Sequence, residues 1–295
     1  MLNLAKRIDM GITSIACSHA QKLKSRGEDR YSTQILENGV FYAGIYDGHN
    51  GSEAATLCAQ MMPEIINAEY RSQKPTINIL RNAFLKCDRN VTGNSGTTAS
   101  VVLLCKNYLV VAHVGDSRVV ICHKGNAVNI TEDHHIEWEP ERDRIKEAER
   151  LLGISLICGQ RVDGLMLTRS IGDHNLSNVI LAYPVVHELF INDDDDFIIM
   201  ASDGFWDVCS GSEATQLIKA RNLSDEREIA EMLVFYASGE YKKRGIKADD
   251  ISCVIINLHK KTDMIHFSED SSGWSFESMM KSDSATIRQL HDIIL

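Results

Sequence analysis

The sequence lacks the marks of several protein classes. None of its eight cysteines forms a Cys-x-x-Cys pair, so we expect small core residues in a reducing compartment rather than a disulfide framework. No apolar run approaches the roughly 20 residues that span a bilayer, and the N-terminus has no signal-peptide core. We therefore expect a cytoplasmic protein, a nuclear one or both, with no membrane contact.

Basic residues are also scarce. The chain has 31 Lys and Arg against 41 Asp and Glu, a formal net charge of −10, which argues against a nucleic-acid partner. An acidic chain that acts on an anionic substrate needs a metal ion to reverse the local field. No linker rich in Pro, Gly and Ser divides the 295 residues internally.

Three common catalytic motifs are missing. No cysteine has an arginine six positions later, as the phosphate loop of cysteine phosphatases requires. There is also no Gly-x-Ser-x-Gly elbow and no Gly-x4-Gly-Lys-Ser/Thr loop. The chemistry must therefore rest on carboxylates, histidine and metal.

What the sequence does contain is two apolar, β-branched stretches that run directly into Asp-Gly, at Asp47-Gly48 and at Asp203-Gly204. A strand held in a core delivers a carboxylate with little positional freedom, and the glycine lets a backbone carbonyl also face a cation. A single Asp-Gly is usually a plain turn, so the context has to decide.

The first context is a hairpin. Asn38-Gly39 predicts a two-residue type I′ turn that fixes the register of the strands on either side. Counting outward places Asp29 opposite Gly48 and Glu28 opposite His49. Such a cluster of carboxylates is destabilising unless a cation such as Mg²⁺ or Mn²⁺ compensates it. A β-bulge would shift the count by one without dispersing the cluster.

The second context is a series of strands joined by short turns. Strand-like runs follow one another at 97–105, 108–114, 118–123 and 126–131. Tight connections predict one antiparallel meander. Counting across Lys124-Gly125 places Asp116 opposite Asp133, although on spacing alone both are as readily turn or capping residues.

Helical spacing of apolar residues predicts helices at 52–70, 76–90, 140–152, 212–219 and 225–238. Antiparallel strands with helices mostly outside them predict an α+β fold, a central sandwich of two mainly antiparallel β-sheets flanked by α-helices. Beyond Lys260 the sequence is rich in Ser, Asp and Glu without a clear period, so we expect a flexible tail or a short helix.

A series of short motifs runs through the chain in a fixed order. They are Glu28-Asp29, Asp47-Gly48-His49-Asn50-Gly51, Ser95-Gly96-Thr97-Thr98-Ala99, Val114-Gly115-Asp116-Ser117-Arg118, Asp133-His134, Arg161-Val162-Asp163-Gly164, Arg169-Ser170-Ile171-Gly172-Asp173, Ala201-Ser202-Asp203-Gly204-Phe205-Trp206-Asp207-Val208 and Asp249-Asp250-Ile251-Ser252. In this order they resemble the metal-dependent protein phosphatases of the 2C type, which dephosphorylate phosphoserine and phosphothreonine. The resemblance covers residues 10–259.

The resemblance implies a binuclear site for two Mg²⁺ or Mn²⁺ ions at one end of the sandwich. Asp47 would bridge both ions, Asp203 and Asp249 would bind one, and the Gly48 carbonyl would help to bind the other. Two such cations lower the pKa of a bridging water, so that hydroxide attacks phosphorus in line without a phosphoenzyme. His49 beside the site is the natural proton donor to the departing alkoxide.

The resemblance also implies an outer set of carboxylates. Glu28 and Asp29 would hold metal-bound waters. A weaker third ion would fall to Asp133, Asp203 and Asp207.

Some positions depart from the family pattern. Lys24 stands five residues before Asp29, where the family usually has an arginine that grips phosphate, and a lysine cannot make the bidentate contact. Arg26 is the rival phosphate ligand. Asn50 replaces a glycine and tolerates positive φ, and Asp250 replaces an asparagine and adds charge near the metals.

We therefore expect a monomeric protein serine/threonine phosphatase that acts on phosphoproteins, with a catalytic domain at 10–259 between an N-terminal extension at 1–9 and a tail at 260–295. The alternative is a pseudophosphatase, a scaffold or regulatory binding protein of the same fold. Such a chain should lack a metal-binding aspartate, yet Asp47 and Asp203 are both present, as is Asp249. A metal-dependent nuclease is disfavoured by the net acidity and the motif order.

Overall fold

The computed structural model describes the greater part of the first 260 residues. The described residues are 7–9, 13–22, 24, 27–37, 39–70, 76–176, 179–220 and 226–260. The chain divides into two compact units, Met1–Lys261 and Thr262–Leu295, and the structure of the first is given below. The expected tail lies outside the described residues from 261 onward.

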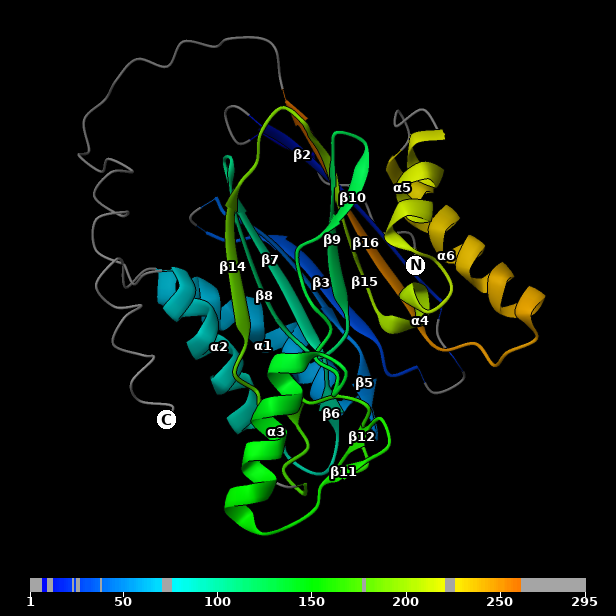
Figure 1. Cartoon of the computed structure of the whole chain (residues 1–295). Coiled ribbons are helices and arrows are strands. Elements are labelled where there is room, and N and C mark those ends of the chain that lie inside the picture. Colours follow the sequence, from blue (N-terminus) through cyan, green and yellow to red (C-terminus); the bar gives the residue numbers. More distant parts are fainter. Residues whose placement is uncertain are drawn as a thin grey trace. The chain divides into compact units, whose positions relative to one another are not determined.

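Two antiparallel sheets form the body of the first unit (Figure 1). The six-stranded sheet has the order β1 (Arg7–Asp9), β2 (Thr13–Lys22), β16 (Ile251–Lys260), β15 (Asp195–Ala201), β9 (Arg118–His123) and β10 (Asn126–Asn129). The five-stranded sheet has the order β14 (Val185–Phe190), β8 (Tyr108–Val114), β7 (Ala99–Cys105), β4 (Phe41–Tyr46) and β3 (Arg30–Ile35). The predominance of antiparallel pairing is confirmed.

The core between the two sheets follows from the alternation of side chains along the strands. On β4, the side chains of Phe41, Ala43 and Ile45 belong to a buried cluster with apolar residues of β9, β15 and β16. Tyr42 and Tyr46, on the opposite face of β4, belong instead to a cluster with helical residues. The expected sandwich with helices outside it is therefore confirmed.

Helices pack on the outer face of each sheet. Those on the outer faces are α1 (Glu53–Tyr70), α2 (Thr76–Asn90), α5 (Gly211–Ala220) and α6 (Glu226–Arg244), while α3 (Glu139–Leu152) and the short α4 (Asp203–Trp206) lie outside these two pairs. Buried residues of α1 and α2 pack on the five-stranded sheet, and those of α5 and α6 pack on the six-stranded sheet. All five predicted helices are present, and the single-turn α4 was not predicted. A short hairpin of two strands follows α3, formed by β11 (Ile157–Cys158) and β12 (Arg161–Val162).

The predicted single meander is wrong. β7 pairs with β8, and β9 pairs with β10, but β8 and β9 belong to different sheets. Between them Gly115 has a φ of 87°, and a Cβ at this position would lie 2.6 Å from the Thr98 side chain. The turn therefore carries the chain from one sheet to the other. Because β8 and β9 are buried on both faces for most of their length, no alternation in their sequences separates them.

The predicted two-residue hairpin turn is also wrong. Ile35 pairs with Phe41, the Leu36 N–H donates to the Val40 carbonyl over 2.9 Å, and the Gly39 N–H donates to the Leu36 carbonyl over 2.9 Å. Gly39 has a φ of 80°, as expected for a three-residue connection that ends in a bulge. The register is therefore shifted by one residue from the predicted count.

Candidate active site

A small third sheet brings together segments that carry the predicted motifs. It consists of β13 (Ile171–Gly172), β6 (Gly96–Thr97) and β5 (Gly48–His49). Gly96 on the central strand pairs with both His49 and Gly172. Figure 1 shows β5 and β6 at the end of the sandwich where β11, β12 and α3 also lie. Chain segments far apart in sequence therefore meet at this end.

The carboxyl groups of Asp47 and Asp203 contact each other at the ends of β4 and β15. They share a side-chain hydrogen bond, and burial together with Asp29 and Asp203 raises the pKa of Asp47 well above its usual range. Burial and the nearby Asp116 raise the pKa of Asp203 to about 7. Two carboxyl groups in hydrogen-bond contact need either a shared proton or a cation between them. The pair therefore forms an oxygen-rich site that fits a divalent cation.

Asp29 lies behind this pair. Its Oδ2 accepts hydrogen bonds from Ser202 Oγ at 2.8 Å and from Ser252 Oγ at 2.6 Å. Its Oδ1 is buried and accepts no hydrogen bond within the described part of the chain. Burial raises the pKa of Asp29 to about 6. An unpartnered buried carboxylate oxygen fits the predicted role of holding a water of a metal ion.

Glu28 fastens the turn that follows His49. Its Oε1 accepts a hydrogen bond from the Gly51 N–H at 2.6 Å. Gly48 has to be a glycine, because a Cβ there would lie 2.7 Å from the Glu28 carbonyl oxygen. Asn50 adopts a φ of 56°, so the predicted tolerance of positive φ is confirmed.

Lys24 and Asp249 form an ion pair between Nζ and Oδ1. Partial burial opposes the charge of Lys24, but Asp249 and other carboxylates outweigh it and raise the lysine pKa. Within the described residues, no three His, Cys, Asp or Glu side chains converge closely enough to hold a metal ion. Asp249 would therefore have to exchange Lys24 for a cation before it could act as a metal ligand.

Asp250 holds the backbone of the loop before the first acidic pair, in addition to the negative charge expected from the sequence. Its Oδ1 accepts the Lys24 N–H at 2.5 Å, and its Oδ2 accepts the Glu28 N–H at 2.6 Å. The buried side chain therefore ties down both ends of the loop that carries the first acidic pair. Arg26, the second candidate phosphate ligand, lies in this loop but outside the described residues.

The structure places Asp116, rather than Asp133, beside the pair expected to bind a third ion. Arg118 holds Asp133 in a bidentate contact, with Nε at 3.0 Å and Nη2 at 2.6 Å from its oxygens. After burial, Asp116 is the next largest influence that raises the pKa of Asp203 and of Asp207. The predicted register is right, since the His134 N–H donates to the Gly115 carbonyl. The carboxylate of Asp133, however, is paired with Arg118.

His49 is partly exposed, with 24% of its side chain accessible, and its Nε2 lies 2.8 Å from Asp173 Oδ2. Neither Asp173 nor Asp116 was among the predicted site residues. Both stand inside recognised motifs, but nothing in those motifs distinguishes a carboxylate at the site from one that ends a turn.

The family model described as "Protein phosphatase 2C" matches residues 17–241. The chain belongs to the protein phosphatase 2C family. It is 36% identical over 249 residues to "Probable protein phosphatase 2C 59" of Arabidopsis thaliana, which covers 80% of this chain and 76% of the relative. Identity is also 36% to "Probable protein phosphatase 2C 71" of Arabidopsis thaliana, with 80% of this chain and 53% of the relative covered.

Two solved structures share the fold of this protein phosphatase 2C chain. The serine-threonine phosphatase 2C of Toxoplasma gondii matches with a TM-score of 0.71 and 17% identity over 88% of this chain and 98% of the other. A C. elegans sex determining protein matches with a TM-score of 0.73 and 23% identity over 84% of this chain and 65% of the other.

The described helices include none that is long and apolar enough to cross a membrane.

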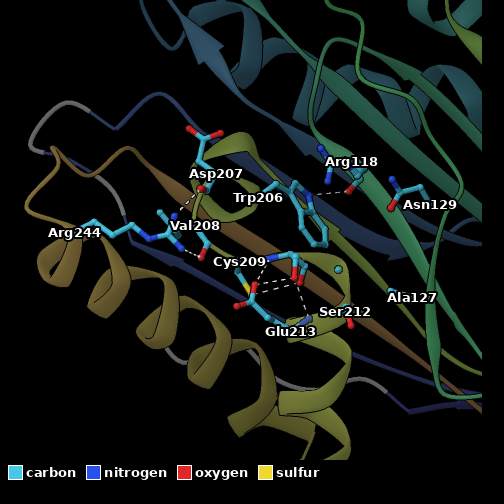
Figure 2. Close-up of a pocket in the computed structure, with 12 residues that line it drawn as sticks. Arg118, Ala127, Asn129, Trp206, Asp207, Val208, Cys209, Ser212, Glu213 and Arg244 are labelled. Atoms are coloured by element: carbon cyan, nitrogen blue, oxygen red, sulfur yellow. Dashed lines mark hydrogen bonds between the residues drawn. The ribbon is translucent and has the colours of Figure 1, made fainter.

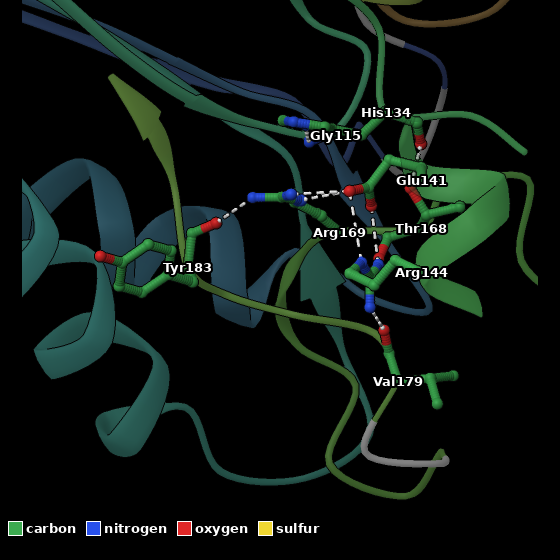
Figure 3. A network of polar contacts seen from close by, with 8 residues as sticks. All are labelled: Gly115, His134, Glu141, Arg144, Thr168, Arg169, Val179 and Tyr183. Carbon is green, nitrogen blue, oxygen red and sulfur yellow. Dashed lines mark hydrogen bonds and ion pairs between the residues drawn. The ribbon is translucent and has the colours of Figure 1, made fainter. Parts of the chain in front are cut away.

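A buried network braces the phosphatase 2C site from the side of α3 (Figure 3). Glu141 Oε1 accepts from Arg169 Nη2 at 2.6 Å, and Oε2 accepts from Arg144 Nη2 at 2.7 Å. Arg144 also donates to the carbonyls of Thr168 and Val179. Burial alone would raise the pKa of Glu141, but the two guanidinium groups outweigh it and lower the value to about 2. The network therefore anchors the segment that leads to Asp173.

A pocket of about 460 Å³ opens beside Asp207 (Figure 2). Arg118 and Trp206 line one side, and Arg244 on the other side donates to the carbonyls of Asp207 and Val208 at 3.1 and 2.8 Å. Arg118 is held by Asp133, so both arginines already have partners in the protein. The pocket therefore adjoins the acidic site, and the two arginines that line it are committed to other groups.

Proposed function

We propose that the chain is a metal-dependent protein serine/threonine phosphatase that hydrolyses phosphoserine and phosphothreonine in proteins. The contact between Asp47 and Asp203 carries this proposal, because two partly buried carboxyl groups with raised pKa values need a cation to be ionised together. Family membership supports the same activity.

The residues that would hold the metal ions are Asp47, Asp203, the Gly48 carbonyl and Asp249 once it releases Lys24. When bound, two Mg²⁺ or Mn²⁺ ions supply an activated water and neutralise the phosphoryl oxygens, so that hydrolysis needs no covalent phosphoenzyme. Asp29 would orient a water through its unpartnered Oδ1.

A weaker third ion would be held by Asp203 and Asp207 together with Asp116. This assignment replaces Asp133, whose two oxygens are engaged by Arg118, with Asp116, of which only Oδ2 has a hydrogen-bond partner within the described residues, His135 Nε2 at 2.7 Å. The raised pKa of Asp207, due to burial and then to Asp116, supports it.

His49 would protonate the leaving oxygen. As the bond between phosphorus and the serine or threonine oxygen breaks, the basic alkoxide takes a proton from the imidazolium and leaves as an alcohol. Lys24, freed from Asp249, would contact the phosphoryl oxygens as a single charge. Glu28, whose Oε1 accepts the Gly51 N–H in the turn after His49, would hold a water of the metal ions together with Asp29.

We place the catalytic domain at 10–259 and propose that it acts as a monomer. A pseudophosphatase is not favoured, because no metal-binding aspartate predicted from the family pattern is missing.

The test is turnover of a phosphothreonine peptide and of an aryl phosphate with Mn²⁺, with Mg²⁺ and with EDTA. We expect both substrates to be hydrolysed with either metal and neither with EDTA. Turnover that persists in EDTA contradicts the metal-dependent mechanism, and a complete lack of turnover in all three conditions favours the scaffold.

A further inference from the structure

The contact between His49 and Asp173 has features that are expected of a functional pair. The two residues are 124 positions apart, and His49 Nε2 lies 2.8 Å from Asp173 Oδ2. The Asp173 side chain is 1% exposed, and its Oδ1 is buried without a hydrogen-bond partner in the described residues. A buried carboxylate with one open oxygen is costly unless its other contact has a use.

Gly96 makes this contact possible. It lies on β6 between His49 on β5 and Gly172 on β13. A Cβ at Gly96 would lie 2.1 Å from Asp173 Oδ2 and 2.3 Å from His49 Nε2. Any side chain here would therefore separate the imidazole from the carboxylate.

Several contacts hold the backbone around Asp173. Its φ is 57°, in the left-handed region that aspartate adopts more readily than most residues other than glycine. Ser170 Oγ lies 2.5 Å from Asp173 Oδ2, and the Asp173 N–H donates to the Ser95 carbonyl at 3.2 Å. On the preceding residue, the Gly172 N–H donates to Asp88 Oδ1 at 2.9 Å. These contacts fix the segment that carries the Asp173 carboxylate.

We propose that Asp173 is the positioning residue of His49. By accepting the Nε2–H, Asp173 holds the ring and leaves Nδ1 as the nitrogen that gives its proton to the leaving oxygen. After the transfer the imidazole is neutral, with its remaining proton on Nε2 and in contact with Asp173. The inference rests on the proposed role of His49 as proton donor.

Leaving groups of different basicity test this role. A serine or threonine alkoxide needs a proton to depart, whereas the phenolate of p-nitrophenyl phosphate leaves without one. We expect Asp173→Ala to lower kcat/KM for a phosphothreonine peptide about a hundredfold, within the usual range for a general acid, and to leave kcat/KM for p-nitrophenyl phosphate within about threefold of the wild type. Asp173→Asn keeps the shape but loses the charge, and its amide can donate to Nε2, so it should show the same selective loss.

Gly96→Ala provides an independent test, because it separates the pair without removing either group. It should reproduce the selective loss of peptide turnover. Gly239→Ala on α6, where an added Cβ meets nothing within 4 Å, is the matched control and should leave both substrates unaffected. Circular dichroism of each variant checks that it is folded.

A nuclear magnetic resonance measurement reports on the contact without any turnover. In the metal-free wild type at alkaline pH, two-bond ¹H–¹⁵N correlations should show His49 as the Nε2–H tautomer, and Asp173→Ala should lose this preference. Equal losses for both substrates in Asp173→Ala, or an unchanged tautomer, would overturn the inference. If His49→Gln shows the selective loss and Asp173→Ala does not, only the positioning role fails. If His49→Gln shows none, the proton-donor role fails as well.

Discussion

Two groups of acidic side chains in this chain differ in what surrounds them. At the ends of β4 and β15, Asp47 and Asp203 face each other, and burial and neighbouring carboxylates raise their pKa values. Beside α3, Glu141 faces Arg144 and Arg169, which overcome its burial and lower its pKa to about 2. The same functional group therefore shifts in opposite directions within one fold.

The difference distinguishes a site that can bind a ligand from an ion-pair network that only stabilises the fold. Facing carboxylates destabilise the fold unless a proton or a cation joins them, so such a pair is retained where something binds. A carboxylate between two guanidinium groups has its partners already and contributes a fixed geometry. The charge of its nearest neighbours therefore decides whether such a carboxyl group serves a binding site or stabilises the fold.

The largest expected effect comes from removing a carboxylate of the facing pair. Asp203→Asn should lower kcat for a phosphothreonine peptide about a thousandfold, since the charge that holds the cation is worth several kcal/mol. Thermal unfolding without metal should occur at the same or a higher temperature than in the wild type, because one of two repelling groups is gone. A large loss of stability would indicate that Asp203 has a structural role instead.

Breaking the other group should reverse this pattern. Glu141→Gln leaves two buried guanidinium groups without their anion and should cost about 3–5 kcal/mol of unfolding free energy, measured by chemical denaturation. Because the folded pKa lies below the usual 4.5, the contribution is present above pH 4.5 and is lost as the pH falls toward 2. The difference from the wild type should therefore shrink in acid.

The control is Glu147→Gln, which breaks the exposed ion pair with Arg150 on the same helix. It should leave the unfolding free energy unchanged. A loss as large as that of Glu141→Gln would contradict the importance of burial in the comparison.

Metal binding should depend on pH in a way that only the facing pair explains. The folded pKa of Asp203 is about 7, above its usual value of 3.8. The stabilisation that its proton gives the fold is therefore complete below pH 3.8 and is lost as the pH rises through 7. A cation can then take its place. At a hundred times the dissociation constant, Mg²⁺ or Mn²⁺ should stabilise the protein by about 2.7 kcal/mol near pH 8 and by less near pH 5.5.

Differential scanning fluorimetry at the two pH values measures this shift. Asp203→Asn should largely abolish it, whereas Glu147→Gln should not. An equal stabilisation at both pH values would show that the cation does not compete with protons for this pair.

The smallest effect concerns the ion pair at the edge of the site. Lys24→Ala should raise the KM for a phosphopeptide about tenfold, the scale of one charged hydrogen bond, and leave kcat close to that of the wild type. Steady-state kinetics with the phosphothreonine peptide measures it. An unchanged KM would exclude Lys24 from phosphate binding and leave it only the contact with Asp249.

Much of the fold was predictable because its signals are local. Helical spacing identified α1 and α2 with their observed ends to within a residue, and Lys124-Gly125 identified the two-residue turn between β9 and β10. Asn38-Gly39 misled because the same dipeptide also ends a three-residue connection, and the choice depends on how the neighbouring strands pack. The change of sheet at Gly115 left no local trace, since the strands on both sides of it are buried on both faces for most of their length.

The sequence by itself determined the five longer helices, the strands at 97–105, 108–114, 118–123 and 126–131, the family and the presence of every aspartate that the family pattern requires, because each is encoded among residues close together in the chain. Only the tertiary structure decided which charged groups are partners. Arg118 pairs with Asp133, His135 contacts Asp116 beside Asp203, and Lys24 reaches Asp249 across 225 positions. Such choices depend on which distant segments the two sheets bring to one end, and no spacing along the chain records that distance.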